Sequence, residues 1–248
     1  IVRIDAESTD PDRVADINKT INDSILPKIK QLYPDVQSRY FGQVEQSEKT
    51  SKSMGYVTMI GISIMFIILA LHFNSLSSAF LIMLVIPAGL AGAIMGHGLI
   101  GIPVSLLSVF GMIALIGVLI NDAIVFLDRY NDLIVEGYTT RQAALEAAIS
   151  RFRPILLTSL TTVAGLLPII SETSMQAQFL IPMATSIAFG VLFGTIFILF
   201  FYPSAILLWN GIRRIGHWIW KGSWIKNGAE AEPAFRISKN DHEIETTL

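Results

Sequence analysis

The sequence predicts a mainly α-helical, polytopic membrane protein, with five transmembrane helices that follow a small segment of mixed α/β structure. Hydrophobic residues make up 52% of the chain and charged residues only 15%, and the mean hydropathy of +0.56 is high for a soluble protein. The charges are also segregated, because residues 56–121 contain no Asp, Glu, Lys or Arg. Both observations indicate long apolar helices that lie in a bilayer.

Residues 1–54 are expected to form a partial domain outside the membrane, followed by a linker. Residues 1–7 alternate apolar and polar side chains as a half-buried strand does, and residues 36–42 are typical of a second strand. Between them, Asp10 and Pro11 indicate the start of a helix that ends before Pro34. Two strands cannot form a stable sheet alone, so this βαβ unit needs strands from elsewhere. The chain is therefore expected to be the carboxy-terminal part of a longer protein.

Five apolar segments follow, each close to the roughly 20 residues that a helix needs to cross a bilayer. They are residues 56–73, 79–100, 104–127, 154–171 and a long segment within 173–212. The last segment is long enough for two crossings, but its middle contains no polar turn, so one span is expected. Residues 55–212 are thus the predicted transmembrane domain.

Basic residues predict the orientation of these spans. Four arginines lie around the connection between the third and fourth spans, and two arginines and two lysines follow the fifth, whereas residues 101–103 and 172–178 have no basic residue. The basic segments are therefore expected in the cytoplasm and residues 1–54 in the periplasm of a bacterium. Residues 140–150, capped by Thr139, should form a short surface helix, and residues 213–248 a mostly disordered cytoplasmic tail.

Asp122 is the main functional candidate, because it lies inside the apolar run of residues 106–131. A carboxylate in hydrocarbon is costly, and such acids commonly handle protons or ions. A polar stripe runs along the fourth span and is expected to pack against the polar face around Asp122, so that this acid can exchange a proton. The predicted relay consists of Asp122, Asn121, Arg151 and Thr158, with Thr161, Thr162 and Asp128 as possible support.

Each of these residues also has a structural interpretation. Asp122 can hydrogen-bond to a neighbouring helix, and Asp128 can form an interfacial ion pair. The threonines can hydrogen-bond to the preceding turn of their own helix. Arg151 can be only one of the positive charges that set the orientation of the spans in the membrane. Small residues at four-residue spacing predict close helix packing, at Gly92, Gly96, Gly190 and Gly194.

The sequence lacks the residues or motifs that several classes of function require. The absence of cysteine excludes disulfides, thiolate metal sites and a cysteine nucleophile, and a net charge of −2 gives no support for nucleic-acid binding. The sequence has no phosphate-binding glycine-rich loop, zinc-protease motif or nucleophile elbow, so no enzyme, cofactor or metal site is expected. A proton gradient is then the expected source of energy.

Three motifs carry a resemblance to a known family. They are LALHFNSLSSAFLIMLVIPAGLAGAI at residues 69–94, GVLINDAIVFLDRYND at 117–132 and RFRPILLTSLTTVAGLLPI at 151–169. In order and spacing they resemble the carboxy-terminal half of resistance-nodulation-division (RND) efflux permeases of the acriflavine-resistance type, over about residues 1–212. The resemblance implies a ferredoxin-like porter subdomain before the last five of twelve spans. It also implies a homotrimeric inner-membrane proton antiporter that exports amphiphilic or drug-like compounds, often with a periplasmic adaptor and an outer-membrane channel.

The resemblance also implies roles for single residues. Arg151 and Thr158 match relay residues of the family, whose relay acids lie on a span of the first half, absent from this chain. Asn121 stands where the drug pumps usually have lysine, and Asp122 where they have asparagine. Either Asp122 takes on part of the relay, or the role of the lysine is dispensable in this branch.

Two other interpretations stay open. INDAIVFLDR followed by TSLTT is also similar to the protein-export subunits SecD and SecF, which fit a six-span unit. The third interpretation is a non-transporting receptor domain of the sterol-sensing type, which binds a ligand without proton coupling. The continuous match through residues 69–94 favours the efflux family. The sequence does not predict the substrate.

Overall fold

A computed structural model describes residues 17, 19–34, 43–221 and 228–235, and it divides the chain into two units, Ile1–Ser53 and Met54–Leu248. In the first unit, a π-helical turn, η2 (Ile21–Ile25), leads into helix α2 (Leu26–Leu32). These lie where the sequence predicts a helix. The two predicted strands of the βαβ unit, residues 1–7 and 36–42, lie outside the described residues.

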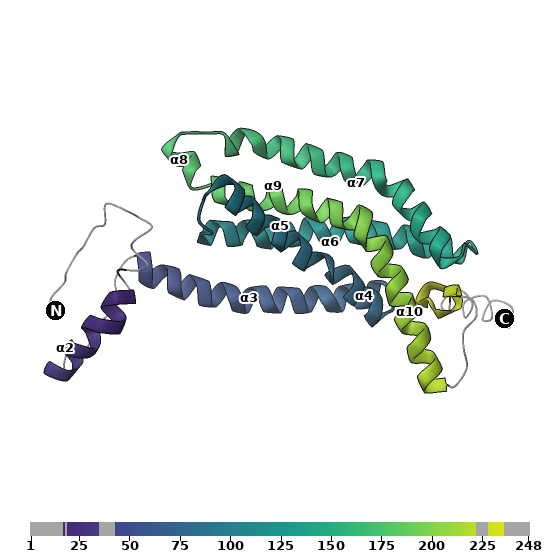
Figure 1. Cartoon of the computed structure of the whole chain (residues 1–248), viewed down its shortest axis with the longest axis horizontal. Coiled ribbons are helices and arrows are strands. Elements are labelled where there is room, and N and C mark those ends of the chain that lie inside the picture. The colour runs from purple at the N-terminus through teal and green to yellow at the C-terminus, as the bar shows by residue number, and fades with distance from the viewer. Residues whose placement is uncertain (1–16, 18, 35–42, 222–227, 236–248) are drawn as a thin grey trace. The chain divides into compact units, whose positions relative to one another are not determined.

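The second unit is a bundle of long helices (Figure 1). Its first helix, α3 (Gln43–His72), begins in the first unit. The other elements are α4 (Leu76–Met83), α5 (Val85–Ile100), α6 (Leu106–Val135), α7 (Thr140–Ile170), α8 (Met175–Gln178), α9 (Ile181–Ile196), η3 (Phe197–Phe201), α10 (Tyr202–Lys221) and η4 (Gly228–Ala231). Among the described residues, five runs are long and apolar enough to cross a membrane: 53–72, 76–100, 106–135, 140–170 and 181–219. The predicted mainly α-helical class with five apolar spans is confirmed.

Capping residues explain where two of the helices begin and where one ends. Ser105 caps α6 and Thr139 caps α7, and each forms a capping box with the residue three positions later, Ser108 and Gln142. Gly101, with φ of 77°, ends α5 in the left-handed conformation that glycine adopts without strain.

Two interruptions inside the spans have proline as their cause. Pro87 has no N–H to donate to the carbonyl of Met83, and α4 ends at Met83 before α5 continues the span. Pro203 likewise cannot donate to Leu199, and the helix widens there into the π-turn η3. Both spans remain single crossings with a local change of direction.

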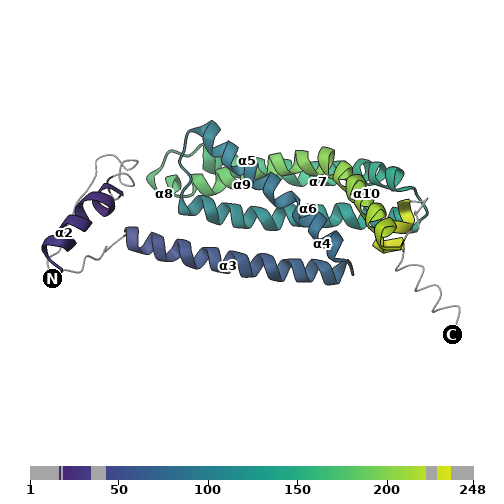
Figure 2. The same ribbon diagram turned by 60° about the horizontal axis from the view of Figure 1, so that its bottom comes forward.

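Helix α9 is the centre of the bundle, since it packs against α5, α6 and α7 (Figures 1 and 2). Glycines make these close approaches possible. A Cβ atom at Gly92 or Gly96 would overlap phenylalanines of α9, and a Cβ at Gly190 or Gly194 would overlap leucines of α6. By contrast, only 11% of the apolar stretch of α3 and of α7 is buried within the bundle. Those surfaces are suited to lipid or to further helices.

The structure differs from the sequence expectation in two places. The predicted surface helix at residues 140–150 is instead the first part of α7, which continues through Pro154 because the loss of one backbone hydrogen bond does not end it. The sequence also predicts that residues 213–248 are a mostly disordered tail. However, α10 continues to Lys221, and residues 228–235 fold against the bundle, where Ala229 and Glu232 are buried. Residues 222–227 and 236–248 lie outside the described part.

Candidate functional site

Asp122 lies in the middle of α6 and is 6% exposed. Its burial follows from the helix period, because Leu115, Leu119 and Phe126 share its side of α6 and are also buried. The carboxylate is therefore held inside the protein and does not face lipid. Intramembrane acids typically face the protein interior in this way.

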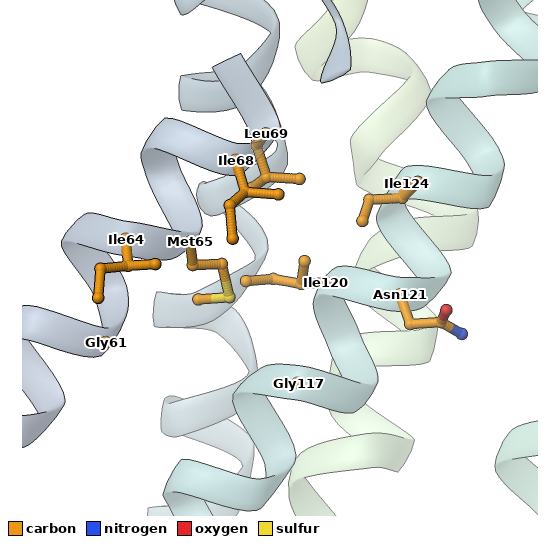
Figure 3. A pocket seen from close by; sticks show the side chains of 9 residues that line it. All are labelled: Gly61, Ile64, Met65, Ile68, Leu69, Gly117, Ile120, Asn121 and Ile124. Atoms are coloured by element: carbon orange, nitrogen blue, oxygen red, sulfur yellow. The ribbon is translucent and has the colours of Figure 1, made fainter. Parts of the chain in front are cut away.

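The neighbouring Asn121 is exposed and belongs to a different surface. It lies on a cavity of about 410 Å³ between α3 and α6, where it is the polar member of an otherwise apolar lining (Figure 3). The amide of Asn121 points away from Met65 and Ile120, which face each other across the cavity (Figure 3). The lining residues are Gly61, Ile64, Met65, Ile68, Leu69, Gly117, Ile120, Asn121 and Ile124.

The threonines of α7 bond to their own helix. The Thr158 hydroxyl donates to the carbonyls of Pro154 and Ile155, at 3.2 and 2.9 Å. Thr161 and Thr162 bond in the same way to the preceding turn. Such bonds satisfy the hydroxyls without a partner on another helix, and Thr158 and Thr161 are exposed.

Arg151 and Asp128 lie toward the end of the bundle that holds the connection between α6 and α7, here called the α6–α7 end. Asp128 joins α6 to α3, because its carboxylate lies 3.7 Å from Nε2 of His72. Arg151 is half-buried and interacts electrostatically with Asp128, but its Nε is buried without a hydrogen-bond partner within the described chain. Arg151 therefore retains unused donor capacity.

The predicted relay is only partly assembled in this chain. Among the described residues, Asp122 forms no ion pair with Arg151 and no hydrogen bond with Thr158. Asp122 faces the bundle interior, whereas Asn121 and Thr158 lie on exposed surface. Asp122 has Asn121 as a hydrogen-bonding neighbour.

The structure brings together a polar pair that sequence reasoning missed. Ser159 of α7 lies 2.5 Å from Thr195 of α9, hydroxyl to hydroxyl, and both side chains are buried. Ile155 and Ser159 are buried four residues apart on one face of α7, and no polar pattern in the sequence marks this face.

A second missed contact lies near the opposite end of the bundle. His97 of α5 is buried, and its Nε2 lies 2.9 Å from the hydroxyl of Ser186 on α9. The Ser186 hydroxyl also lies 3.1 Å from the carbonyl of Pro182. No sequence motif connects these residues, because they are 89 positions apart.

Five apolar spans, a buried carboxylate in the third and a central helix with close glycine contacts define a polytopic membrane protein. The sequence model of the AcrB/AcrD/AcrF family matches residues 1–209. The chain belongs to this family, the RND permeases, as its motifs indicate.

Three relatives illustrate the breadth of the family. The chain is 28% identical over 185 residues to the multidrug resistance protein MdtC of Erwinia tasmaniensis, and the matched segment covers 74% of this chain and 18% of that protein. It is 34% identical over 151 residues to the swarming motility protein SwrC of Bacillus subtilis, covering 60% and 14%. It is 30% identical over 162 residues to the cobalt-zinc-cadmium resistance protein CzcA of Cupriavidus metallidurans, covering 65% and 15%.

The fold also matches a solved structure. A crystal structure of a heavy metal efflux pump superposes with a TM-score of 0.66 at 23% sequence identity, over 79% of this chain and 19% of that chain. This likeness concerns the fold. The chain thus spans less than a fifth of the length of each of these proteins.

Proposed function

We propose that this chain forms part of the membrane domain of a proton-driven efflux transporter in a bacterial inner membrane. The observation that carries the proposal is Asp122, a carboxylate buried within an apolar helix of a permease family. An intramembrane acid that faces the protein interior is suited to bind and release protons. A membrane potential of 100 mV supplies about 2.3 kcal/mol for each charge that crosses.

The exposed polar residues have a role in this proposal. Because the chain spans under a fifth of its relatives, helices from the rest of the transporter can cover Asn121 and Thr158. The half-buried side chain of Arg151 can then bind a relay acid that those helices supply. Thr161, Thr162 and Asp128 support this surface.

Family membership supports a proposal for the assembly. RND permeases generally work as trimers, with a periplasmic adaptor and an outer-membrane channel. We assign the same arrangement to the intact transporter, with residues 1–54 in the periplasmic porter subdomain and the α6–α7 end in the cytoplasm. The positive charges around the α6–α7 connection favour this orientation.

The substrate class has two candidates. Amphiphilic, drug-like compounds are the first, and the similarity to MdtC, a multidrug resistance protein, favours them. A divalent metal cation is the second, and the similarity to CzcA, a cobalt-zinc-cadmium resistance protein, favours it. Residues outside this chain are expected to decide between them, because the substrate pocket of the family lies largely in the porter region.

Substitution of Asp122 tests the proposal. The intact transporter is placed in inverted membrane vesicles, a pH gradient is established, and ethidium or Zn²⁺ is added while proton release is followed with a pH-sensitive dye. We expect Asp122→Asn to reduce probe-dependent proton release at least tenfold, because asparagine cannot carry a proton. Asp132→Asn, an exposed acid on the same helix, is the matched control and should keep the wild-type rate. Coupled transport at the wild-type rate in Asp122→Asn contradicts the relay.

A further inference from the structure

A buried carboxylate at the α6–α7 end has no part in the predicted relay. Glu232 is 2% exposed and lies in residues 228–235, here called the C-terminal strap. Its Oε2 forms an ion pair with Arg213, and its Oε1 accepts hydrogen bonds from Asn210 at 2.6 Å and from the Tyr130 hydroxyl at 3.1 Å. Every polar atom of this carboxylate therefore has a partner.

These partners come from separate helices. Tyr130 belongs to α6, and Asn210 and Arg213 belong to α10. Arg213 also donates through Nε and Nη2 to the hydroxyl of Ser77 in α4, at 3.1 and 2.8 Å. A single side chain of the strap thus connects α6 with α10 directly, and it connects them with α4 through Arg213.

The rest of the strap is also fitted to the bundle. The Asn210 amide donates to the carbonyl of Gly228 at 2.8 Å, and Gly228 lies against Thr140 at the start of α7. Ala229 and Ala231 are buried, and Phe235 packs against the apolar core. Specific apolar and polar contacts therefore both hold the segment.

Burial of a carboxylate is unfavourable unless a cation and hydrogen bonds compensate it. Here the compensation is complete only while the strap is docked, because removal of Glu232 leaves the buried Tyr130 hydroxyl without this acceptor and leaves the half-buried Arg213 with only Ser77. Asn210, Arg213 and Glu232 lie beyond residues 1–209, the part that matches the family's sequence model.

We propose that Glu232 is a positioning residue of the transporter, and that the docked strap fixes the part of α6 that carries Asp122. Tyr130 lies eight residues after Asp122, about 12 Å along the helix. A shift at Tyr130 would therefore move the carboxylate of Asp122 relative to the helices that surround it. This inference rests on the proposed function, because it assigns Glu232 an effect on proton coupling.

Docking itself can be measured without a transport assay. The chain contains no cysteine, so Thr140→Cys with Gly228→Cys gives one defined pair. A Cβ atom at Gly228 would lie 3.1 Å from Oγ1 and 3.3 Å from Cγ2 of Thr140, a separation that a disulfide can bridge. We expect rapid cross-linking under mild oxidation in the intact transporter, in a background without other cysteines. Glu146→Cys with Gly228→Cys is the control, because Glu146 is exposed further along α7.

Transport measurements then test the positioning role. We expect Glu232→Ala to slow cross-linking and to lower the maximal rate of coupled ethidium or Zn²⁺ transport at least threefold. The probe concentration that gives half the maximal rate and the amount of protein in the membrane should not change. Glu146→Ala should keep the wild-type rate. The disulfide between positions 140 and 228, introduced into Glu232→Ala, should restore most of the lost rate because it docks the strap covalently.

The outcomes separate the two proposals. Absence of the cross-link between positions 140 and 228, or Glu232→Ala at the wild-type rate with cross-linking lost, overturns the positioning role alone. A rate loss that the covalent cross-link does not restore also overturns it, since docking would then be insufficient. A wild-type protein that moves neither probe contradicts the proposed function as well, and this is seen before any variant is made.

Discussion

Asp122 and Glu232 are both buried carboxylates, but their partners differ. Glu232 forms an ion pair with Arg213 and accepts two further hydrogen bonds, so it is held within a connected network. Asp122 has no cationic partner within the described chain, so it can take up a proton without breaking an ion pair. The two environments suit a fixed structural contact and a proton-exchanging group respectively.

Adjacent hydroxyls on α7 should separate stability from transport. Ser159→Ala removes the buried bond to Thr195 and is expected to cost about 1 kcal/mol of unfolding free energy. Thr158→Ala should change stability by less than about 0.5 kcal/mol, because Thr158 is exposed and bonds only its own backbone. Under the proposed function, Thr158→Ala should nevertheless lower coupled transport.

Thermal unfolding in detergent and proton release in vesicles measure the two effects. Equal loss of stability in Ser159→Ala and Thr158→Ala would contradict the assignment of Ser159 to the buried face. Unchanged transport in Thr158→Ala would remove this threonine from the relay.

At the scale of the elements, glycine decides how closely α5 can approach α9. Gly96 lies directly against Phe189, whereas no described atom outside the local helix lies within 4 Å of the Cβ position at Gly98, two residues further along α5. The two positions have the same residue type and the same helix but opposite environments. They form a matched pair.

We expect Gly96→Ala to destabilise the bundle by about 1 to 3 kcal/mol, because the added methyl group overlaps Phe189 and forces the helices apart. Gly98→Ala should be neutral or stabilising by about 0.5 to 1 kcal/mol, since alanine favours the helix and meets open space. Melting temperatures of the purified variants in detergent check both values. A neutral Gly96→Ala would show that the α5–α9 contact can adjust at little cost.

At the scale of the whole molecule, the exposed apolar surfaces of α3 and α7 indicate where the chain meets lipid or further helices. Both helices are long enough to cross a bilayer but bury little of their surface within the chain. The main packing within the chain is formed by α9 with the helices around it, α5, α6 and α7. The chain therefore leaves two sides of the bundle open to lipid or to further helices.

The proposed orientation predicts which connections face each side of the membrane. Val104→Cys, in the exposed connection between α5 and α6, should react with a membrane-impermeant maleimide in cells whose outer membrane is made permeable. Tyr138→Cys, in the exposed connection between α6 and α7, should react only after the inner membrane is opened. The reverse pattern would invert the proposed topology and place the strap in the periplasm.

Much of the fold could be predicted from local composition. The spans are recognisable because a run of apolar side chains can be satisfied only in a bilayer or a core, and Thr139 is recognisable as a cap from its spacing to Gln142. The length of α7 could not be predicted from the sequence. A proline such as Pro154 ends some helices and is tolerated inside others. Neighbouring packing decides which occurs.

The site was predictable only in part. Asp122 stands out because an acid in an apolar helix is rare. The polar stripe around Thr158 is the visible signal on α7, while the contact with α9 uses the adjacent Ser159. Polarity alone does not show which face of a helix is buried, since a threonine hydroxyl can be satisfied by its own backbone.

The sequence by itself determined the class of the protein, the number of apolar spans, the family and the position of the intramembrane acid, because these depend on residues that are close together along the chain. Only the tertiary structure decided that Ser159 meets Thr195 and that Glu232 docks against Tyr130 and Arg213. Tyr130 and Glu232 are 102 positions apart. Their contact depends on the packing of α4, α6 and α10, which no local pattern of residues encodes.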